Sequence, residues 1–118
     1  MGTAAIMLAT GTAQAASWGT TNLTSWTSKG NVKVGTAKFT ANGDKLTVCD
    51  RRADGYSPAV RVFRHSDFKL VWTVRATHGN GTCTTASKNL GESTKYEFWA
   101  DTDPYGDYVI KITTAGAS

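Results

Sequence analysis

The chain has 118 residues, of which 40% are hydrophobic and 19% are charged, and its formal net charge is +4. A chain of this length forms one modest hydrophobic core, which predicts a single domain. The apolar run Ala4–Ala9 is far shorter than the roughly 18 residues of a membrane-spanning helix, so we expect no membrane anchor.

The first residues have the pattern of a secretory leader. The apolar run Ala4–Ala9 leads into small residues and the triplet Ala13-Gln14-Ala15, which is the kind of site that signal peptidase cuts. A complete leader opens with Lys or Arg, and none precedes Lys29, so we infer that the true start lies upstream. We therefore expect residues 1–15 to be a truncated signal peptide and residues 16–118 to be one secreted, extracellular domain. An Ala/Thr-rich tail of a cytosolic protein is the alternative.

The charges are distributed unevenly along the chain. The segment Lys29–Lys88 holds eleven basic and four acidic residues, whereas the segment from Asn89 onward holds two basic and five acidic residues. Such an asymmetry can attract an anionic partner or place copies of the chain head to tail. An ordinary solvated surface is the alternative.

The two cysteines, Cys49 and Cys83, are an even number, and thiols of exported proteins are oxidised. We expect them to form one disulfide, which stabilises the fold by about 4 kcal/mol in the chain-entropy model. A metal site is not expected, because there is no Cys-x-x-Cys pair and because His65 and His78 are too few and too scattered.

Apolar residues alternate with polar ones from Val32 onward, and the alternation changes parity after Gly35, as a β-bulge at this glycine requires. Asn42-Gly43 follows, which is the strongest short signal for a β-hairpin. A two-residue turn at this dipeptide places Phe39 opposite Leu46 on one face of the hairpin.

Short segments with strand periodicity continue to the C-terminus, separated by Gly-, Asn- and Asp-rich loops. They are Val60–Phe63, Leu70–Val74, Cys83–Ala86, Tyr96–Ala100 and Tyr108–Ile112. In the second of them, Leu70, Trp72 and Val74 share one parity, which we expect to face the core.

No window has helical periodicity, so the chain is predicted to be all-β. Seven or eight short strands with one disulfide indicate an antiparallel β-sandwich or a small barrel. The immunoglobulin variant is disfavoured, because Gly81 stands two residues before Cys83, where that fold has a tyrosine.

The chain lacks the short motifs of common enzymes. It contains no Gly-x-Ser-x-Gly, no His-Glu-x-x-His and no glycine-rich phosphate loop. Glu92 and Glu97 belong to an expected loop and strand with no evident common cleft. We therefore expect neither enzymatic activity nor a cofactor.

The segment Asp101–Asp107 has some features of a calcium loop, with oxygen-bearing side chains at alternating positions. However, Tyr105 occupies the fifth position, and Ile112 stands where a bidentate glutamate would bind the ion. We expect an Asp/Pro/Gly turn between two strands rather than a metal site.

Aromatic residues provide the main candidate binding site. Trp99 has the opposite parity from Tyr96 and Phe98, so it is expected to point outward and to act as an exposed anchor. The acidic loop that follows adds residues on the same side. The predicted binding surface consists of Trp99, Asp101, Asp103, Tyr105 and Asp107.

A weaker candidate is a basic patch, consisting of Arg51, Arg52, Arg61 and Arg64. In an exported protein such a patch fits an acidic polysaccharide, an anionic lipid or an acidic protein rather than a nucleic acid. Arg51-Arg52 beside a disulfide also fits a protease-inhibitory loop. Basic residues scattered over solvated faces are the alternative.

Several short motifs resemble the small secreted β-sandwich proteins of Streptomyces and related actinobacteria, most of which have no assigned function. The motifs are Cys49-Asp50, Ala53–Ser57, Cys83, Gly91-Glu92 and an aromatic strand that ends at Trp99. The resemblance covers roughly Phe39–Tyr108. Members often have a further cysteine after the aromatic strand, which this chain lacks at Trp99–Asp101. Some proteins of this kind resemble the adaptor subunit of secreted umbrella-shaped toxin particles, which implies a binding role.

Together these features predict a secreted, non-enzymatic binding or adaptor protein that acts through contacts with an extracellular protein. A carbohydrate-binding module that recognises a polysaccharide is the first alternative, and a small inhibitor of an extracellular hydrolase is the second. Three structural features distinguish them. A row of coplanar exposed aromatic rings favours sugar, an unpaired strand edge favours a protein partner, and a rigid protruding loop favours inhibition.

Overall fold

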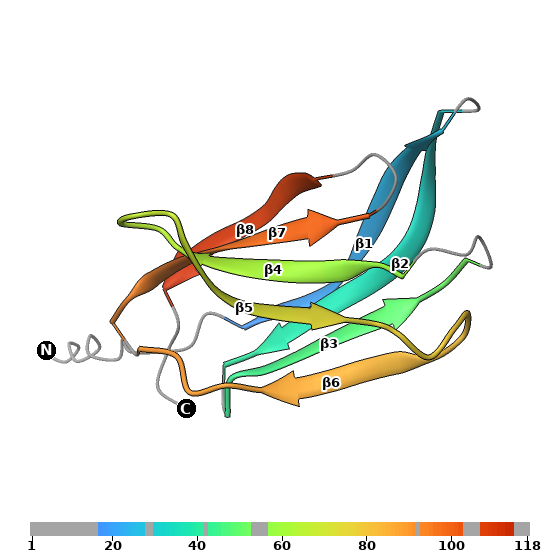
Figure 1. The fold of residues 1–118 in the computed structure, drawn as a ribbon. Coiled ribbons are helices and arrows are strands. Elements are labelled where there is room, and N and C mark those ends of the chain that lie inside the picture. Colours follow the sequence, from blue (N-terminus) through green and yellow to red (C-terminus); the bar gives the residue numbers. More distant parts are fainter. Residues whose placement is uncertain are drawn as a thin grey trace, which may run out of the picture.

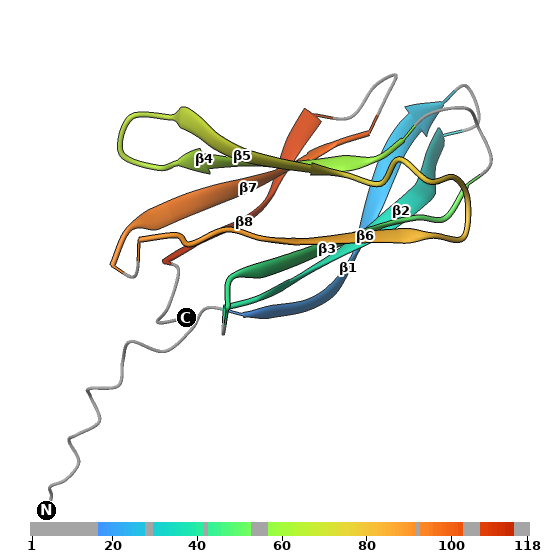
Figure 2. The ribbon, with the colours of Figure 1, turned by 60° about the horizontal axis from the view of Figure 1, so that its bottom comes forward.

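Two antiparallel four-stranded sheets lie face to face in the computed structural model (Figures 1 and 2). The structure describes residues 17–27, 30–41, 43–52, 57–91, 93–102 and 107–114. Sheet A has the strand order β1-β2-β3-β6, and sheet B has the order β5-β4-β7-β8. The strands are β1 (Trp18–Thr27), β2 (Gly30–Thr40), β3 (Lys45–Asp50), β4 (Ala59–Arg64), β5 (Lys69–Arg75), β6 (Cys83–Ser87), β7 (Lys95–Asp101) and β8 (Asp107–Thr114).

The prediction of an all-β antiparallel sandwich of seven or eight strands with one disulfide is confirmed. The described ranges contain no helix, and accordingly no helix that could cross a membrane. The predicted signal peptide, residues 1–15, lies outside the described residues.

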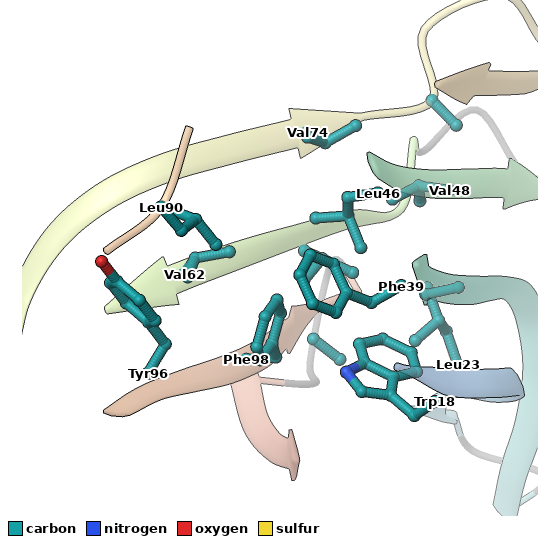
Figure 3. Close-up of a cluster of buried hydrophobic side chains, with 14 of the residues drawn as sticks. Trp18, Leu23, Phe39, Leu46, Val48, Val62, Val74, Leu90, Tyr96 and Phe98 are labelled. Carbon is teal, nitrogen blue, oxygen red and sulfur yellow. The ribbon is translucent and has the colours of Figure 1, made fainter. Parts of the chain in front are cut away.

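Aromatic rings from both sheets meet in the core (Figure 3). Phe39 of β2 and Phe98 of β7 are fully buried, with ring centroids 4.9 Å apart, and Trp18 of β1 contacts Phe98 edge-on at 5.4 Å. Leu46 and Val62 complete this centre from β3 and β4. The inward parity of each strand therefore supplies one continuous core between the sheets.

The hairpin β2–β3 has the predicted register, with Phe39 opposite Leu46. Gly43 has φ +86° and Asp44 has φ +46°, while Asn42 lies outside the described residues. The turn is anchored from the side, because the buried carboxylate of Asp44 accepts a 2.9 Å hydrogen bond from the main-chain N–H of Leu90.

The parity change near Gly35 corresponds to an irregularity in β2. In the pairing with β1, Leu23 lies opposite Gly35 and Thr24 lies opposite Lys33, so Val34 is the additional residue. A Cβ atom on Gly35 would overlap the backbone carbonyl oxygen of Cys49. This position therefore requires glycine because another backbone passes so close.

Strands β1 and β2 curve at one end and approach the end of β7 (Figure 1). Hydrogen bonds fasten this contact between the sheets. The main-chain N–H of Thr24 donates to Oη of Tyr108 at 2.8 Å, and the hydroxyl of Thr102 donates to the carbonyl of Thr24 at 2.6 Å. The bend closes one side of the sandwich.

The predicted disulfide between Cys49 and Cys83 is confirmed, and it joins the neighbouring strands β3 and β6 of sheet A. The neighbour relations of β2 to β8 match those of strands A, B, C, C′, E, F and G of immunoglobulin-type sandwiches. The position of the disulfide differs, because in antibody domains the disulfide joins the two sheets, whereas Cys49–Cys83 joins two strands of the same sheet. The strand order alone is therefore shared with that architecture.

The prediction that Leu70 faces the core together with Trp72 and Val74 is wrong for Leu70. A register shift between the pairs Val62–Trp72 and Phe63–Leu70 places one additional residue in β5. Leu70 consequently lies beside Phe63 and is 43% exposed, whereas Val74 remains buried and Trp72 packs against the core.

Candidate functional site

The outer face of sheet B is a regular grid of side chains, because paired residues of adjacent strands point to the same side. The three rows across β5, β4, β7 and β8 are Arg75, Ala59, Asp101 and Asp107; Thr73, Arg61, Trp99 and Val109; and Leu70, Phe63, Glu97 and Ile112. The first row is charged at three of its four positions. The second and third rows carry most of the apolar side chains.

Three aromatic rings gather on this face, toward the turn between β4 and β5. Phe68, from the turn after β4, stacks on Phe63 with the ring centroids 4.3 Å apart and the planes within 7°. Trp99 lies edge-on to both rings, at 6.3 Å from Phe63 and 5.8 Å from Phe68. The guanidinium of Arg61 lies 5.4 Å from the centroid of Phe63, within the range of a cation–π contact.

The exposed large hydrophobic residues of the described chain all belong to this side of sheet B. Phe68 is 52% exposed, Leu70 43%, Val109 43% and Ile112 50%. We call this set, with the two rings beneath it, the aromatic face. Its members are Phe63, Phe68, Leu70, Trp99, Val109 and Ile112.

A shallow hollow of about 260 Å³ opens in the aromatic face. Its lining consists of Arg61, Phe63, Phe68, Trp99 and Asp107. The hollow therefore combines an aromatic floor with Arg61 and Asp107. Aromatic residues and arginine are enriched at protein interfaces, whereas aspartate is depleted there.

The outer face of sheet A is different in chemistry. The side chains opposite the core are mainly hydroxyls and amines, such as those of Lys38, Thr47 and Thr85. The hydroxyls of Thr47 and Thr85 lie 2.9 Å apart. A polar face of this kind is well solvated, so the apolar patch is confined to one side of the sandwich.

Hydrogen bonds to Glu97 hold the indole of Trp99. The Nε1–H of Trp99 donates to Oε1 of Glu97 at 2.9 Å, and Nδ1 of His65 lies 2.7 Å from Oε2. The hydrogen bond from Trp99 and then the contact with His65 lower the pKa of Glu97. Glu97 therefore keeps its charge and fixes the orientation of the ring.

An ion pair closes the turn that carries Phe68. Nε and Nη2 of Arg64 donate to the two carboxylate oxygens of Asp67 at 3.0 and 2.8 Å. This bidentate contact lowers the pKa of Asp67 to about 2. The exposed pair restrains the turn next to Phe68, which has an unusual φ of +53°.

Two of the predicted site residues, Trp99 and Asp107, lie together, and a third, Asp101, forms an ion pair with Arg75. Trp99 points outward, as its parity predicts, but it is half-buried by its aromatic neighbours, and Asp107 lines the same hollow. The carboxylate of Asp101 is paired with Arg75 at 2.7 Å, and this pair covers the buried Ala59.

Part of the predicted surface lies outside the described residues. Asp103 and Tyr105 belong to this part, together with the other residues of the segment 103–106, which has some features of a calcium loop. Within the described ranges, no three His, Cys, Asp or Glu side chains are grouped to hold a metal ion.

The predicted basic patch is divided between the two outer faces. Arg61 lies beside Trp99 on sheet B, and Arg64 is paired with Asp67. Arg51 lines a second hollow on the outer face of sheet A, with its Nη2 3.8 Å from Sγ of Cys83. Arg52 follows Arg51, and its main-chain N–H bonds to a carboxylate oxygen of Asp50. Arg61 is therefore the arginine that joins the aromatic face.

The sequence reasoning did not select Phe63, Phe68 or Leu70 for the site. The alternation of Phe63 with Val62 predicts that Phe63 points outward, which agrees with its position on the outer face of sheet B. No signal indicated Phe68, because a bulky residue with positive φ is uncommon in a turn. Leu70 was missed because the additional residue in β5 changes its side.

Comparison of the chain with models of protein families, with curated proteins and with solved structures finds no match in any of the three. The function therefore has to be inferred from the geometry of the described surface.

Proposed function

We propose that this chain is a secreted, non-enzymatic binding or adaptor domain that acts through protein–protein contacts at the aromatic face. The observation that carries this proposal is the gathering of the exposed hydrophobic side chains on one side of sheet B. Monomeric proteins rarely expose a large contiguous apolar patch, and such patches commonly mark interaction sites. Aromatic residues and arginine are enriched among the residues that contribute most to binding.

Two further features support a secreted binding protein. A disulfide in a small domain is compatible with an oxidising, extracellular location. The resemblance to small secreted actinobacterial proteins, some of them similar to a toxin-particle adaptor, also fits a binding role.

The geometry of the rings favours a protein over a sugar. Sugar-binding platforms present flat ring faces in an open row, whereas Phe68 covers one face of Phe63 at 4.3 Å. Trp99 stands at 72° to Phe68 and at 78° to Phe63. These three rings therefore form an irregular apolar anchor rather than a coplanar row. The inhibitor alternative rests on Arg51-Arg52 beside the disulfide. Arg51 lines a hollow on the outer face of sheet A, and residues 53–56 lie outside the described residues.

The test is affinity capture from the culture filtrate of the producing organism, with the wild-type domain and surface variants immobilised side by side. Trp99→Ala and Phe68→Ser should weaken capture of the same extracellular protein by more than about 1 kcal/mol each. Lys38→Ser, on the outer face of sheet A, is the matched control and should leave capture unchanged.

Two results would overturn the proposal. One is capture of the same protein at equal strength by the wild type and both aromatic-face variants. The other is tight binding to insoluble chitin or cellulose that Trp99→Ala abolishes, which would favour the carbohydrate alternative. Thermal unfolding of each variant confirms that lost binding is not lost folding.

A further inference from the structure

The outer face of sheet B has opposite charges on its two sides. The half formed by β5 and β4 presents Arg75 and Arg61, and the half formed by β7 and β8 presents Glu97, Asp101 and Asp107. Arg75 and Asp101 are paired with each other at 2.7 Å, so the remaining charges are Arg61 on one half and Glu97 and Asp107 on the other. Apolar side chains connect the two halves. This arrangement is complementary to itself, because one half of the face matches the other half of an identical face.

Resting on the proposed function, we infer that the protein bound by the aromatic face is a second copy of this chain, in a symmetric dimer with the two B sheets packed face to face. The two-fold axis lies between the faces and runs along the strands, between β4 and β7. It places β5 of one copy over β8 of the second copy, and β4 over β7. Sheets that pack in this way keep their strands within about 30° of each other.

The axis places each row of the grid over the same row of the second copy. The pairings at the two edges and at Arg61 are complementary, while Phe63 faces Glu97 and Ala59 faces Asp101. Leu70 faces Ile112 of the second copy, so the exposed apolar residues at both ends of the third row become covered. Arg61 faces Trp99 of the second copy, and the hollow beside Arg61 leaves room for that ring. Asp107 faces Arg75 of the second copy, where the guanidinium already paired with Asp101 can bind a second carboxylate.

Edge-to-edge pairing through β8 is less favourable than this packing. The pairs Trp99–Val109 and Phe98–Lys111 leave one additional residue, Ile110, in β8. A bulge and a lysine on an edge strand are both features that hinder the addition of another strand. Both features oppose the addition of a strand at the edge and do not prevent packing on the outer face of the sheet.

The size of the face predicts a weak dimer. Four strands about 4.8 Å apart, each contributing about seven residues of about 3.4 Å, give a face of about 450 Å² per copy. Two copies then bury about 900 Å² in total, just below the lower limit of about 1,000 Å² for a specific interface. Dissociation should therefore occur in the micromolar range or above.

Sedimentation velocity of the secreted protein tests the inference over about 5 to 500 µM, a range chosen to span this expected affinity. The weight-average mass should rise from one copy toward two copies. Leu70→Lys or Ile112→Glu alone should weaken dimerisation at least about tenfold, because each buries a charge against an apolar side chain. An equimolar mixture of the two variants should restore dimers, because the introduced ammonium and carboxylate face each other at one position and Leu70 meets Ile112 at the other.

Thr85→Lys and Ser87→Glu are the matched controls, because both positions are exposed on sheet A. They should leave the dimerisation constant unchanged. A wild type that stays monomeric throughout would overturn the inference, as would a dimer that neither Leu70→Lys nor Ile112→Glu weakens. Failure of the mixture to restore dimers would overturn the two-fold arrangement.

The proposed function can fail separately. If the wild type is monomeric but the aromatic-face variants lose an extracellular protein in the capture experiment, the second copy is wrong and the binding surface stands. If neither dimerisation nor capture depends on the aromatic face, both proposals are wrong.

Discussion

Phe68 combines an unfavourable backbone with favourable ring contacts, and substitution can separate the two. Its φ of +53° costs about 1–2 kcal/mol for a residue other than glycine. Its ring is 52% exposed, so about 100 Å² of it is buried, which at about 25 cal/mol/Å² stabilises the fold by about 2.5 kcal/mol. The stack on Phe63 and the edge contact with Trp99 add about 1 kcal/mol. The net contribution of Phe68 is therefore about 2 kcal/mol.

Two substitutions at this position should reduce the stability of the fold by different amounts. Phe68→Ala removes the ring but keeps the unfavourable φ, so it should destabilise the fold by about 3 kcal/mol. Phe68→Asn removes the same contacts, but asparagine tolerates the left-handed region, so the loss should be about 2 kcal/mol. Urea unfolding with the disulfide intact measures both values by linear extrapolation.

The difference in the free energy of unfolding between Phe68→Ala and Phe68→Asn tests the backbone strain. If Phe68→Asn is as destabilised as Phe68→Ala, the backbone at this position is not strained. If both variants unfold within about 0.5 kcal/mol of the wild type, the stack on Phe63 does not contribute to stability.

Gly35→Ala should destabilise the fold by about 2 kcal/mol or more, because the new methyl group overlaps the carbonyl oxygen of Cys49; an unchanged urea midpoint would contradict this close approach. Gly43→Val should cost at least about 1 kcal/mol, because a β-branched side chain opposes φ +86°, and the same unfolding measurement checks it. NMR titration should find the pKa of Asp67 near 2, and Arg64→Gln should return it toward 3.8. Because the folded pKa is the lower one, the ion pair stabilises the fold above the ordinary pKa, and this contribution is lost as the pH falls toward 2.

Local patterns were sufficient for the hairpin and for the direction of Trp99. Phe39 pairs with Leu46, which is the register that the Asn42-Gly43 signal predicts. Strand β1 was not predicted, because polar residues interrupt its apolar alternation. It forms through pairing with β2 and through the burial of Trp18 and Leu23, which depend on residues far along the chain.

The aromatic face could be predicted only in part, because its composition also depends on pairing between strands that are distant in the sequence. The additional residues in β5 and β8 are consequences of strand pairing, and they turn Leu70 and Ile112 to the side of Trp99. Phe68 reaches this side because the ion pair in its turn and the ring of Phe63 hold it there. The register shifts depend on strands that are distant in the sequence, and the positive φ of Phe68 is not indicated by its residue type.

The sequence by itself determined the all-β class, the disulfide and the outward parity of Trp99. Each follows from residues close together in the chain, or from the presence of a single pair of cysteines. The tertiary structure decided which strands are neighbours, where their registers shift and which exposed side chains share a face. A shift of one residue in a strand reverses the side of every residue beyond it, so the composition of the aromatic face depends on pairings between distant segments.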